Sequence, residues 1–299
     1  MIFPSMGERA RGVLLTVGAA FCFSTAGILV RHVESVPAVG IVFWRSVFMF
    51  AFIAAVLAVW YRGQLVEKVR EAGRPGVISA CFLGSTFFLF IFSITRTTIA
   101  DASALMSTGP LFLAVAAWIY LGERPRAGTW LAIAAALGGV ALMFAEGLGT
   151  GRLAGNLLAL GVPACFTANY IVLRRAAATA DPTVAAMLAA LFSAIVAAPL
   201  AAPFDLALRD LPLLIALGVF QTGLGLVLIT RAYGRLTAGE LGLLALIEPV
   251  LAPLWVWIGI GERPGAAALA GAAIVIGAVL AYQVYTLRTR PAIAPAVSG

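Results

Sequence analysis

The chain has 299 residues, of which 62% are hydrophobic and only 11% are charged, and its formal net charge is +7. A soluble globular domain is about 25% charged, so this composition excludes an ordinary soluble enzyme or binding domain. The apolar runs are about 17–25 residues long, which is the length that crosses the ~30 Å hydrocarbon layer of a bilayer. We therefore predict an all-α polytopic membrane protein, whose basic residues record orientation rather than nucleic-acid binding.

Ten apolar runs follow one another along the sequence, and each is a candidate transmembrane helix. Basic residues precede the first run, as in a signal peptide, but its pattern recurs inside the chain, which favours a permanent helix. The predicted spans are 12–30, 38–61, 77–94, 102–121, 129–144, 153–173, 183–204, 211–232, 239–260 and 266–287.

The sequence contains an internal repeat. The tetrapeptide Gly-Glu-Arg-Pro occurs at 122–125 and again 139 residues later, and in each copy a proline precedes it by twelve residues. Residues 23–31 resemble residues 166–174 at an offset of 143. We therefore predict two copies of one unit. The predicted parts are a first half at 1–147, a linker at 148–152, a second half at 153–287 and a tail at 288–299.

The basic residues predict the orientation. With a cytoplasmic amino terminus, fourteen Lys and Arg residues fall in cytoplasmic segments and five in external ones, so both termini are predicted to be cytoplasmic. Each half has five spans, an odd number, so the second half enters the membrane from the opposite side. Inverted repeats of this kind are a recurring architecture of secondary transporters.

The repeated pattern of a proline, then Glu-Arg-Pro, then a Gly-rich helix resembles the EamA-type branch of the drug/metabolite transporter superfamily. The second copy, at 247–264, is close to that pattern, and the first is looser, with Thr108-Gly109-Pro110 before its tetrapeptide. Within the superfamily the chain is most similar to YddG-type exporters of aromatic amino acids and other small metabolites. The resemblance implies ten helices around a central cavity in the cytoplasmic membrane of a bacterium.

The resemblance implies a secondary transporter that exports small organic solutes, amino acids among them, by alternating access. The coupling ion that we consider is the proton. Exporters of drug-like cations or nucleotide sugars, and a channel-like or regulatory protein on the same scaffold, are the alternatives. No Walker sequence is present, and the single histidine and three scattered cysteines offer no metal or catalytic site. We predict no enzymatic activity, no metal and no cofactor.

In this family's architecture helices one, three, four, six, eight and nine surround the cavity, so polar and aromatic residues on these helices are implied to line it. The structural alternative for each polar residue is an interhelical hydrogen bond, and for each ring it is packing. The candidates are Ser24, Thr25, Ser85, Thr86, Phe87, Phe90, Ser107, Asn169, Tyr170, Gln221 and Thr222.

Two charges and two prolines within the spans also require explanation. Glu248 is either a proton-coupling or substrate-ammonium site or part of a buried structural pair, since a charge there costs at least ~2.5 kcal/mol on insertion scales. Arg45, at a position often basic in this family, is either a structural anchor or a carboxylate binder. Pro110 and Pro249 each remove a backbone hydrogen bond and are either packing kinks or hinges.

Small residues recur at four-residue intervals in the fifth and tenth spans, for example at Ala135 and Gly139 and at Ala273 and Gly277. Such spacing lets two helices approach closely. It predicts either packing between the two halves or a homodimer, and the sequence leaves both open.

Overall fold

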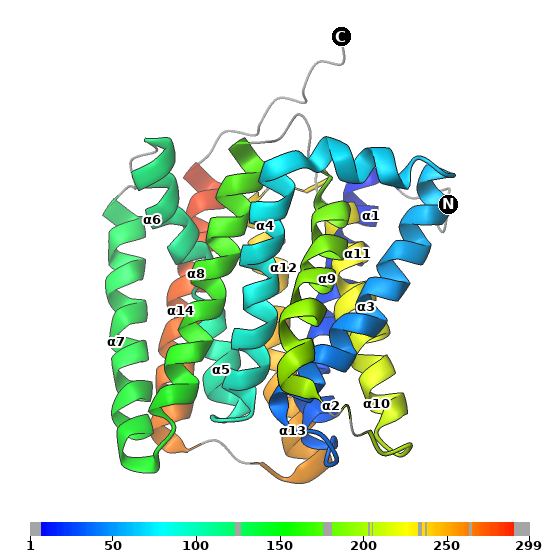
Figure 1. Ribbon diagram of the computed structural model, residues 1–299. Coiled ribbons are helices and arrows are strands. Elements are labelled where there is room, and N and C mark those ends of the chain that lie inside the picture. The colour runs from blue at the N-terminus through cyan, green and yellow to red at the C-terminus, as the bar shows by residue number, and fades with distance from the viewer. Residues whose placement is uncertain are drawn as a thin grey trace.

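The computed structural model describes residues 7–122, 127–175, 181–202, 204, 206–232, 235–236, 238–262 and 265–289. Of the repeated tetrapeptides, residues 123–125 and 263–264 lie outside these ranges. Long helices stand side by side and run between two faces of the molecule (Figure 1). The first helix begins and the last helix ends at the same face, which we call the near face; the opposite face is the far face.

Three of the predicted spans are divided into two α-helices, and the eighth contains a π-helical segment. In chain order the elements are α1 (Glu8–Ser24), α2 (Ala26–Arg31), α3 (Ala38–Tyr61), α4 (Leu65–Ile94), α5 (Ile99–Met106), α6 (Gly109–Leu121), α7 (Ala127–Thr150), α8 (Leu153–Arg175), α9 (Pro182–Ala201), α10 (Leu211–Ile215), the π-helix η1 (Ala216–Leu224), α11 (Gly225–Ala232), α12 (Ala238–Ala245), α13 (Ile247–Ile260) and α14 (Ala266–Thr289).

The helices have the length and composition of membrane spans. Within the described ranges, eight helical segments are long and apolar enough to cross a bilayer, and two shorter apolar helices, Ala127–Met143 and Ile247–Ile260, lie at the fifth and ninth predicted spans. The prediction of an all-helical, multi-pass membrane protein is confirmed. The third helix starts earlier than the predicted span because α4 begins with a charged segment that lies across the near face (Figure 1). The chain turns into the upright helix at Gly73, where φ is +51°.

The divided spans break where hydroxyl side chains or a proline weaken helical hydrogen bonding. In the first span the hydroxyls of Ser24 and Thr25 each donate to a carbonyl three residues earlier, at 2.7 Å. In the fourth span Pro110 lies in the first turn of α6, and in the ninth Pro249 lies in the first turn of α13. Both predicted hinge prolines therefore stand directly after a helix break, and their hinge role stays a prediction.

The buried apolar residues are arranged differently toward the two faces. Toward the far face a single cluster joins residues of α2, α3, α4, α5, α7, α8, α9, α10, α13 and α14. Toward the near face there are two clusters, one on α3, α4, α9 and α11 and the other mainly on α6, α7 and α14. Among the described residues, one cluster connects the helices toward the far face, whereas two separate clusters, each with residues of both halves, lie toward the near face.

Asp210, in the loop before α10, connects two loops at the far face. Its carboxylate accepts from the backbone N–H groups of Glu34 at 3.1 Å and Ser35 at 2.6 Å. Hydrogen bonding by the hydroxyl and the N–H of Ser35 lowers the pKa of Asp210 from its ordinary value. The carboxylate therefore stays charged at neutral pH and keeps the 33–37 loop against the start of the eighth span.

The small residues of the fifth and tenth spans pack α7 against α14 within one chain. A Cβ atom added to Gly139 would lie 2.7 Å from the carbonyl oxygen of Gly271, so the two backbones approach as closely as glycine allows. Gly138 and Gly277 have no atom within 4 Å of such a Cβ. The predicted packing between the halves is therefore observed, and the homodimer stays a prediction.

Replacing Gly139 with Ala is expected to destabilise the protein by about 1–3 kcal/mol, because the added methyl group forces α7 and α14 apart. Gly138→Ala is the matched control: the same change one residue earlier meets no neighbour and should leave stability unchanged or slightly raised. Thermal unfolding of the purified proteins in detergent measures both. Equal melting temperatures for the two variants would contradict the observed α7–α14 contact.

Candidate functional site

A network of charged and polar groups joins helices of both halves at the far face. Arg31, at the end of α2, donates to Glu262 after α13 at 2.9 Å and to the carbonyl oxygen of Thr97 at 3.0 Å. Glu262 also accepts from the backbone N–H of Ile99 at 3.1 Å. These contacts connect α2 and α13 to the loop that leads into α5.

Asn156 of α8 and Arg152, directly before α8, hold this loop and the start of α5. The Thr97 hydroxyl bonds to Asn156 at 2.5 Å, and Arg152 pairs with the buried carboxylate of Asp101 at 3.3 Å. The Asn156 amide also donates to the carbonyl of Met143 in α7, at 3.4 Å. We name this set the far-face clasp; its members are Arg31, Thr97, Ile99, Asp101, Arg152, Asn156 and Glu262.

The first span runs parallel to the ninth through the full depth of the molecule. Three polar contacts between them all join residues 231 positions apart, namely Arg9 with Glu240, Ser24 with Trp255 and Arg31 with Glu262. A constant separation means that the two spans rise in register, since each residue of an α-helix adds the same 1.5 Å. A sliding movement between them would therefore break contacts at both faces and in the middle.

The break in the first span is the point where three helices meet. The indole N–H of Trp255 donates to the Ser24 hydroxyl at 2.9 Å, and the amide of Gln221 in η1 donates to the carbonyl of Phe23 at 3.3 Å. Thr222 donates to the side-chain oxygen of Gln221 at 2.5 Å. The sequence analysis named Ser24, Gln221 and Thr222 as candidates to line the cavity, but it did not single out Trp255. The available signal was an indole N–H inside an apolar run, which needs an acceptor.

Arg45 is a buried cation that makes no ion pair with any described residue. It lies in α3 with 1% of its surface exposed. Its guanidinium donates to the carbonyl of Phe87 at 3.2 Å and lies 5.1 Å and 5.9 Å from the ring centroids of Phe87 and Phe90. Its Nε–H has no hydrogen-bond partner within the described ranges. A guanidinium has five N–H donors, so most of the binding capacity of Arg45 is unused.

Glu248 lies in the first turn of α13, directly after the break at Leu246. It is half-buried, and its carboxylate makes no hydrogen bond or ion pair with a described residue. Leu246 belongs to a near-face cluster, and Ala252, one turn after Glu248, belongs to the far-face cluster. Glu248 therefore lies at the level between the single far-face cluster and the two near-face clusters. Because Glu248 is only half-buried, part of the cost of burying an unpaired charge is avoided.

A comparison with protein families identifies the chain. The EamA-like transporter family matches residues 10–145 and again residues 153–282. The chain belongs to this family. It is 30% identical over 277 residues to the pseudopaline exporter CntI of Pseudomonas aeruginosa, covering 90% of this chain and 95% of that one. It is 29% identical over 274 residues to protein RarD of Escherichia coli, covering 87% and 89%. The predicted membership of the drug/metabolite transporter superfamily is confirmed.

More distant relatives agree with this assignment. Human solute carrier family 35 member G1 is 25% identical over 285 residues, which cover 89% of this chain and 76% of that one. A solved crystal structure superimposes on this chain with a TM-score of 0.66 and 20% sequence identity. The match covers 94% of this chain and 99% of the solved chain, and it shows that the two share a fold. The bacterial EamA-like relatives point to the inner membrane of a bacterium. The closer similarity to YddG-type exporters stays a prediction.

The remaining predicted cavity residues of this EamA-like chain are not gathered at one place. Ser85, Thr86 and Ser107 donate to carbonyls of their own helices. Asn169 of α8 accepts from Ser79 of α4 at 2.5 Å, a contact between helices that the sequence did not predict. Only the Asn169 bond is the interhelical kind considered as the structural alternative, and a cavity-lining role for the four residues stays a prediction.

Replacing Arg45 with Gln removes a buried charge that has one hydrogen bond, so we expect the melting temperature to stay unchanged or to rise. Arg31→Gln is the contrasting variant, because it removes a paired cation and leaves Glu262 without its partner. We expect Arg31→Gln to cost roughly 1 kcal/mol, as half-exposed pairs contribute modestly. Thermal unfolding in detergent compares the two variants with the parent chain. A fall for Arg45→Gln as large as that for Arg31→Gln would identify Arg45 as a structural anchor.

Proposed function

We propose that this chain is a secondary transporter that exports small organic metabolites by alternating access and has no enzymatic activity. In this proposal ten transmembrane helices form two inverted halves, 1–147 and 153–287, around a central pathway. The near face is cytoplasmic, as the distribution of basic residues predicts, and so are both termini. The relatives named as transporters and exporters support the general function and the outward direction.

The observation that carries the proposal is the difference between the two faces. At the far face the clasp and a single apolar cluster join both halves. Toward the near face the apolar residues form two clusters on different helices. This arrangement is the one expected of a transporter conformation that is closed at the far face and open at the near face.

Two ion pairs support the inverted repeat. Arg9 pairs with Glu240 at the near face, and Arg152 pairs with Asp101 at the far face. The two arginines are 143 residues apart and the two acidic residues 139 apart, which are the offsets of the sequence repeat. Ion pairs that are equivalent in sequence but lie at opposite faces are expected of two copies turned over in the membrane.

Segments of the first and sixth spans that correspond in the repeat also differ in exposure. This difference is expected if the protein is closed at the far face and open at the near face. In the first span, Phe23 is half-buried and Gly27 is buried where the span approaches the far face. Their counterparts in the sixth span, Phe166 and Tyr170, approach the near face and are 43% and 36% exposed. Exchange of these two environments between the halves would close the near face and open the far face, which is the step that transport needs.

We propose amino acids, aromatic ones in particular, as the substrates. The unused N–H groups of Arg45 fit a carboxylate, and the adjoining rings of Phe87 and Phe90 offer apolar surface to an aromatic side chain. Glu248 has no partner and fits an ammonium group or a transported proton. We take the proton as the coupling ion.

Liposomes containing the purified protein test the proposal. Vesicles loaded with unlabelled phenylalanine are expected to accumulate labelled phenylalanine transiently, and the initial rate should saturate with its concentration. Vesicles without protein and vesicles containing Arg45→Gln are the controls, and both should lack this counterflow. Flux that rises linearly with concentration and shows no counterflow would contradict a transporter and favour a channel-like protein.

Replacing Glu248 with Gln keeps the size of the side chain and removes its titration. We expect the transport rate of the parent chain to vary with pH and that of Glu248→Gln to be independent of it, because the variant cannot exchange a proton. Glu67→Gln, an exposed change at the near face, is the matched control and should keep the pH dependence. Uptake into liposomes over a range of pH values measures all three proteins. A pH profile of Glu248→Gln equal to that of the parent chain would exclude Glu248 as the coupling residue.

A further inference from the structure

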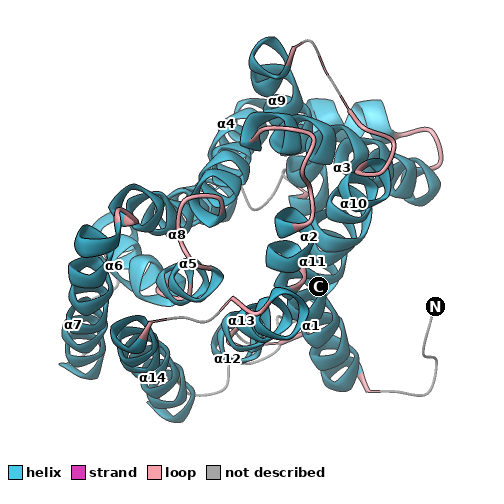
Figure 2. Ribbon diagram, turned by 90° about the horizontal axis from the view of Figure 1, so that it is seen from below, coloured by secondary structure: helices cyan, strands magenta, loops and turns pink. Residues whose placement is uncertain are grey.

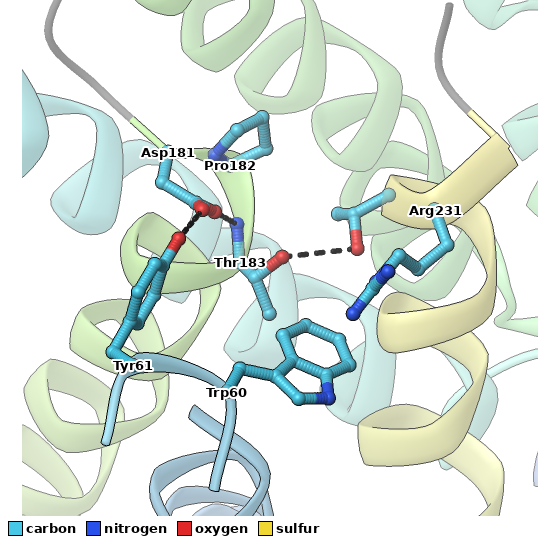
Figure 3. A pocket seen from close by; sticks show the side chains of 7 residues that line it. Trp60, Tyr61, Asp181, Pro182, Thr183 and Arg231 are labelled. Carbon is cyan, nitrogen blue, oxygen red and sulfur yellow. Dashed lines mark hydrogen bonds between the residues drawn. The ribbon is translucent and has the colours of Figure 1, made fainter. Parts of the chain in front are cut away.

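A second polar site lies at the near face, where the ends of α3 and α11 meet the start of α9. These elements line an open cavity of about 240 Å³, several times the ~30 Å³ share of one water molecule, and Figure 3 shows the side chains around it. It lies about fifteen residues along α3 from Arg45, which is roughly 22 Å for an α-helix. The far-face clasp is at the opposite end of the molecule. The cavity is therefore separate from the residues assigned to transport.

The cavity contains the guanidinium of Arg231, which stacks on the Trp60 ring but makes no ion pair with a described residue. Arg231 lies with its guanidinium carbon 3.7 Å from the centroid of the Trp60 ring (Figure 3). Within the described ranges it makes no ion pair and its guanidinium has no hydrogen bond. Arg235, four residues later on the same face, pairs instead with Glu8 at 2.9 Å. Stacking on Trp60 orients the Arg231 group and leaves its N–H edge available for two parallel bonds to phosphate oxygens.

A carboxylate lies across the same cavity. Asp181 caps α9 by accepting from the backbone N–H of Thr183 at 2.6 Å, and it also accepts from the Tyr61 hydroxyl (Figure 3). It makes no ion pair with Arg231 or with another described residue. The hydroxyls of Thr183 and Thr230 bond to each other at 3.2 Å between the two charges. The cavity thus presents one cation and one anion that do not neutralise each other.

The depth of the site limits which ligands reach it. Trp60 and Tyr61 end a transmembrane helix, and these two residue types gather where acyl chains give way to lipid headgroups. A phospholipid phosphate at this depth can meet Arg231, and a primary ammonium a few bonds away can donate to Asp181. A quaternary ammonium has no N–H to donate, and a headgroup without a cation gains nothing from Asp181.

We propose that this cavity binds the headgroup of a phospholipid that carries both a phosphate and a primary ammonium, as phosphatidylethanolamine does. Arg231 binds the phosphate, Trp60 holds Arg231 in place, and Asp181 accepts from the ammonium. The site selects one headgroup from the surrounding bilayer and anchors the near-face ends of α3, α9 and α11 to it.

Native mass spectrometry of the delipidated full chain in detergent tests the proposal, with phosphatidylethanolamine, phosphatidylcholine and phosphatidylglycerol of identical acyl chains as probes. We expect phosphatidylethanolamine to bind about tenfold or more tightly than the other two, the effect of a charge-assisted hydrogen bond. Arg231→Gln should lose this binding by a similar factor. Arg70→Gln, an exposed change of the same charge on the same face, should retain it.

The Asp181→Asn variant tests the role of the carboxylate. Asn is as good a helix cap as Asp, so α9 and the fold should be preserved, as a melting temperature close to that of the parent chain would show. We expect this variant to lose the preference for phosphatidylethanolamine over phosphatidylglycerol. Equal losses in Arg231→Gln and Arg70→Gln, or an unchanged preference in Asp181→Asn, would overturn the proposal. So would equally tight binding of glycerophosphoethanolamine, which would make the ligand a soluble zwitterion.

Discussion

A lipid bilayer offers no water to a broken helix, and this constraint determines how the centre of the molecule is built. The first span breaks at Ser24 and Thr25, and the groups exposed there meet donors from two other helices, Gln221 of η1 and Trp255 of α13. The π-helical segment is part of the same arrangement, since such segments re-aim side chains within a helix. The break in the first span therefore depends on contacts with the eighth and ninth spans, which belong to the other half. Their neighbouring positions are visible along the membrane normal (Figure 2).

Much of the helical layout could be predicted from the sequence, because an apolar run of about twenty residues has one stable conformation in a bilayer. The early start of α4 at Leu65 was missed because its first turns carry charges and lie across the near face instead of spanning the membrane. The contacts of the candidate site could not be predicted from composition or spacing. Trp255 and Ser24 are 231 residues apart, and only the packing of two spans in register brings them together. Asp101 and Glu240 are separated by the 139-residue offset of the repeat, but that offset alone does not assign an arginine partner to either carboxylate.

Within the far-face clasp, the Arg31–Glu262 pair has the energetic character of a contact that can open. The Arg31 and Glu262 side chains are 26% and 22% exposed, and pairs with this access to water contribute about 1 kcal/mol or less. Breaking a fully buried pair would instead cost about 3–5 kcal/mol, because each charge would be left without water. Partly exposed pairs of this kind can help to hold a face closed and add only about 1 kcal/mol each to the free energy of opening it. A ligand can shift an equilibrium of that size through a modest difference in affinity for the two states.

In the proposed mechanism, Arg45 connects this equilibrium to the substrate. A charge at its depth costs at least ~2.5 kcal/mol on insertion scales, and a hydrophobic residue of similar size would fill the space without that cost. On α3 it lies between Val42, which belongs to the far-face cluster, and Met49, which belongs to a near-face cluster. A movement that repacks these clusters must change the surroundings of Arg45. Any state in which the guanidinium meets a bound carboxylate gains free energy that the closed, unliganded packing lacks. In our proposal, this unfavourable residue would thereby supply the differential affinity that alternating access requires.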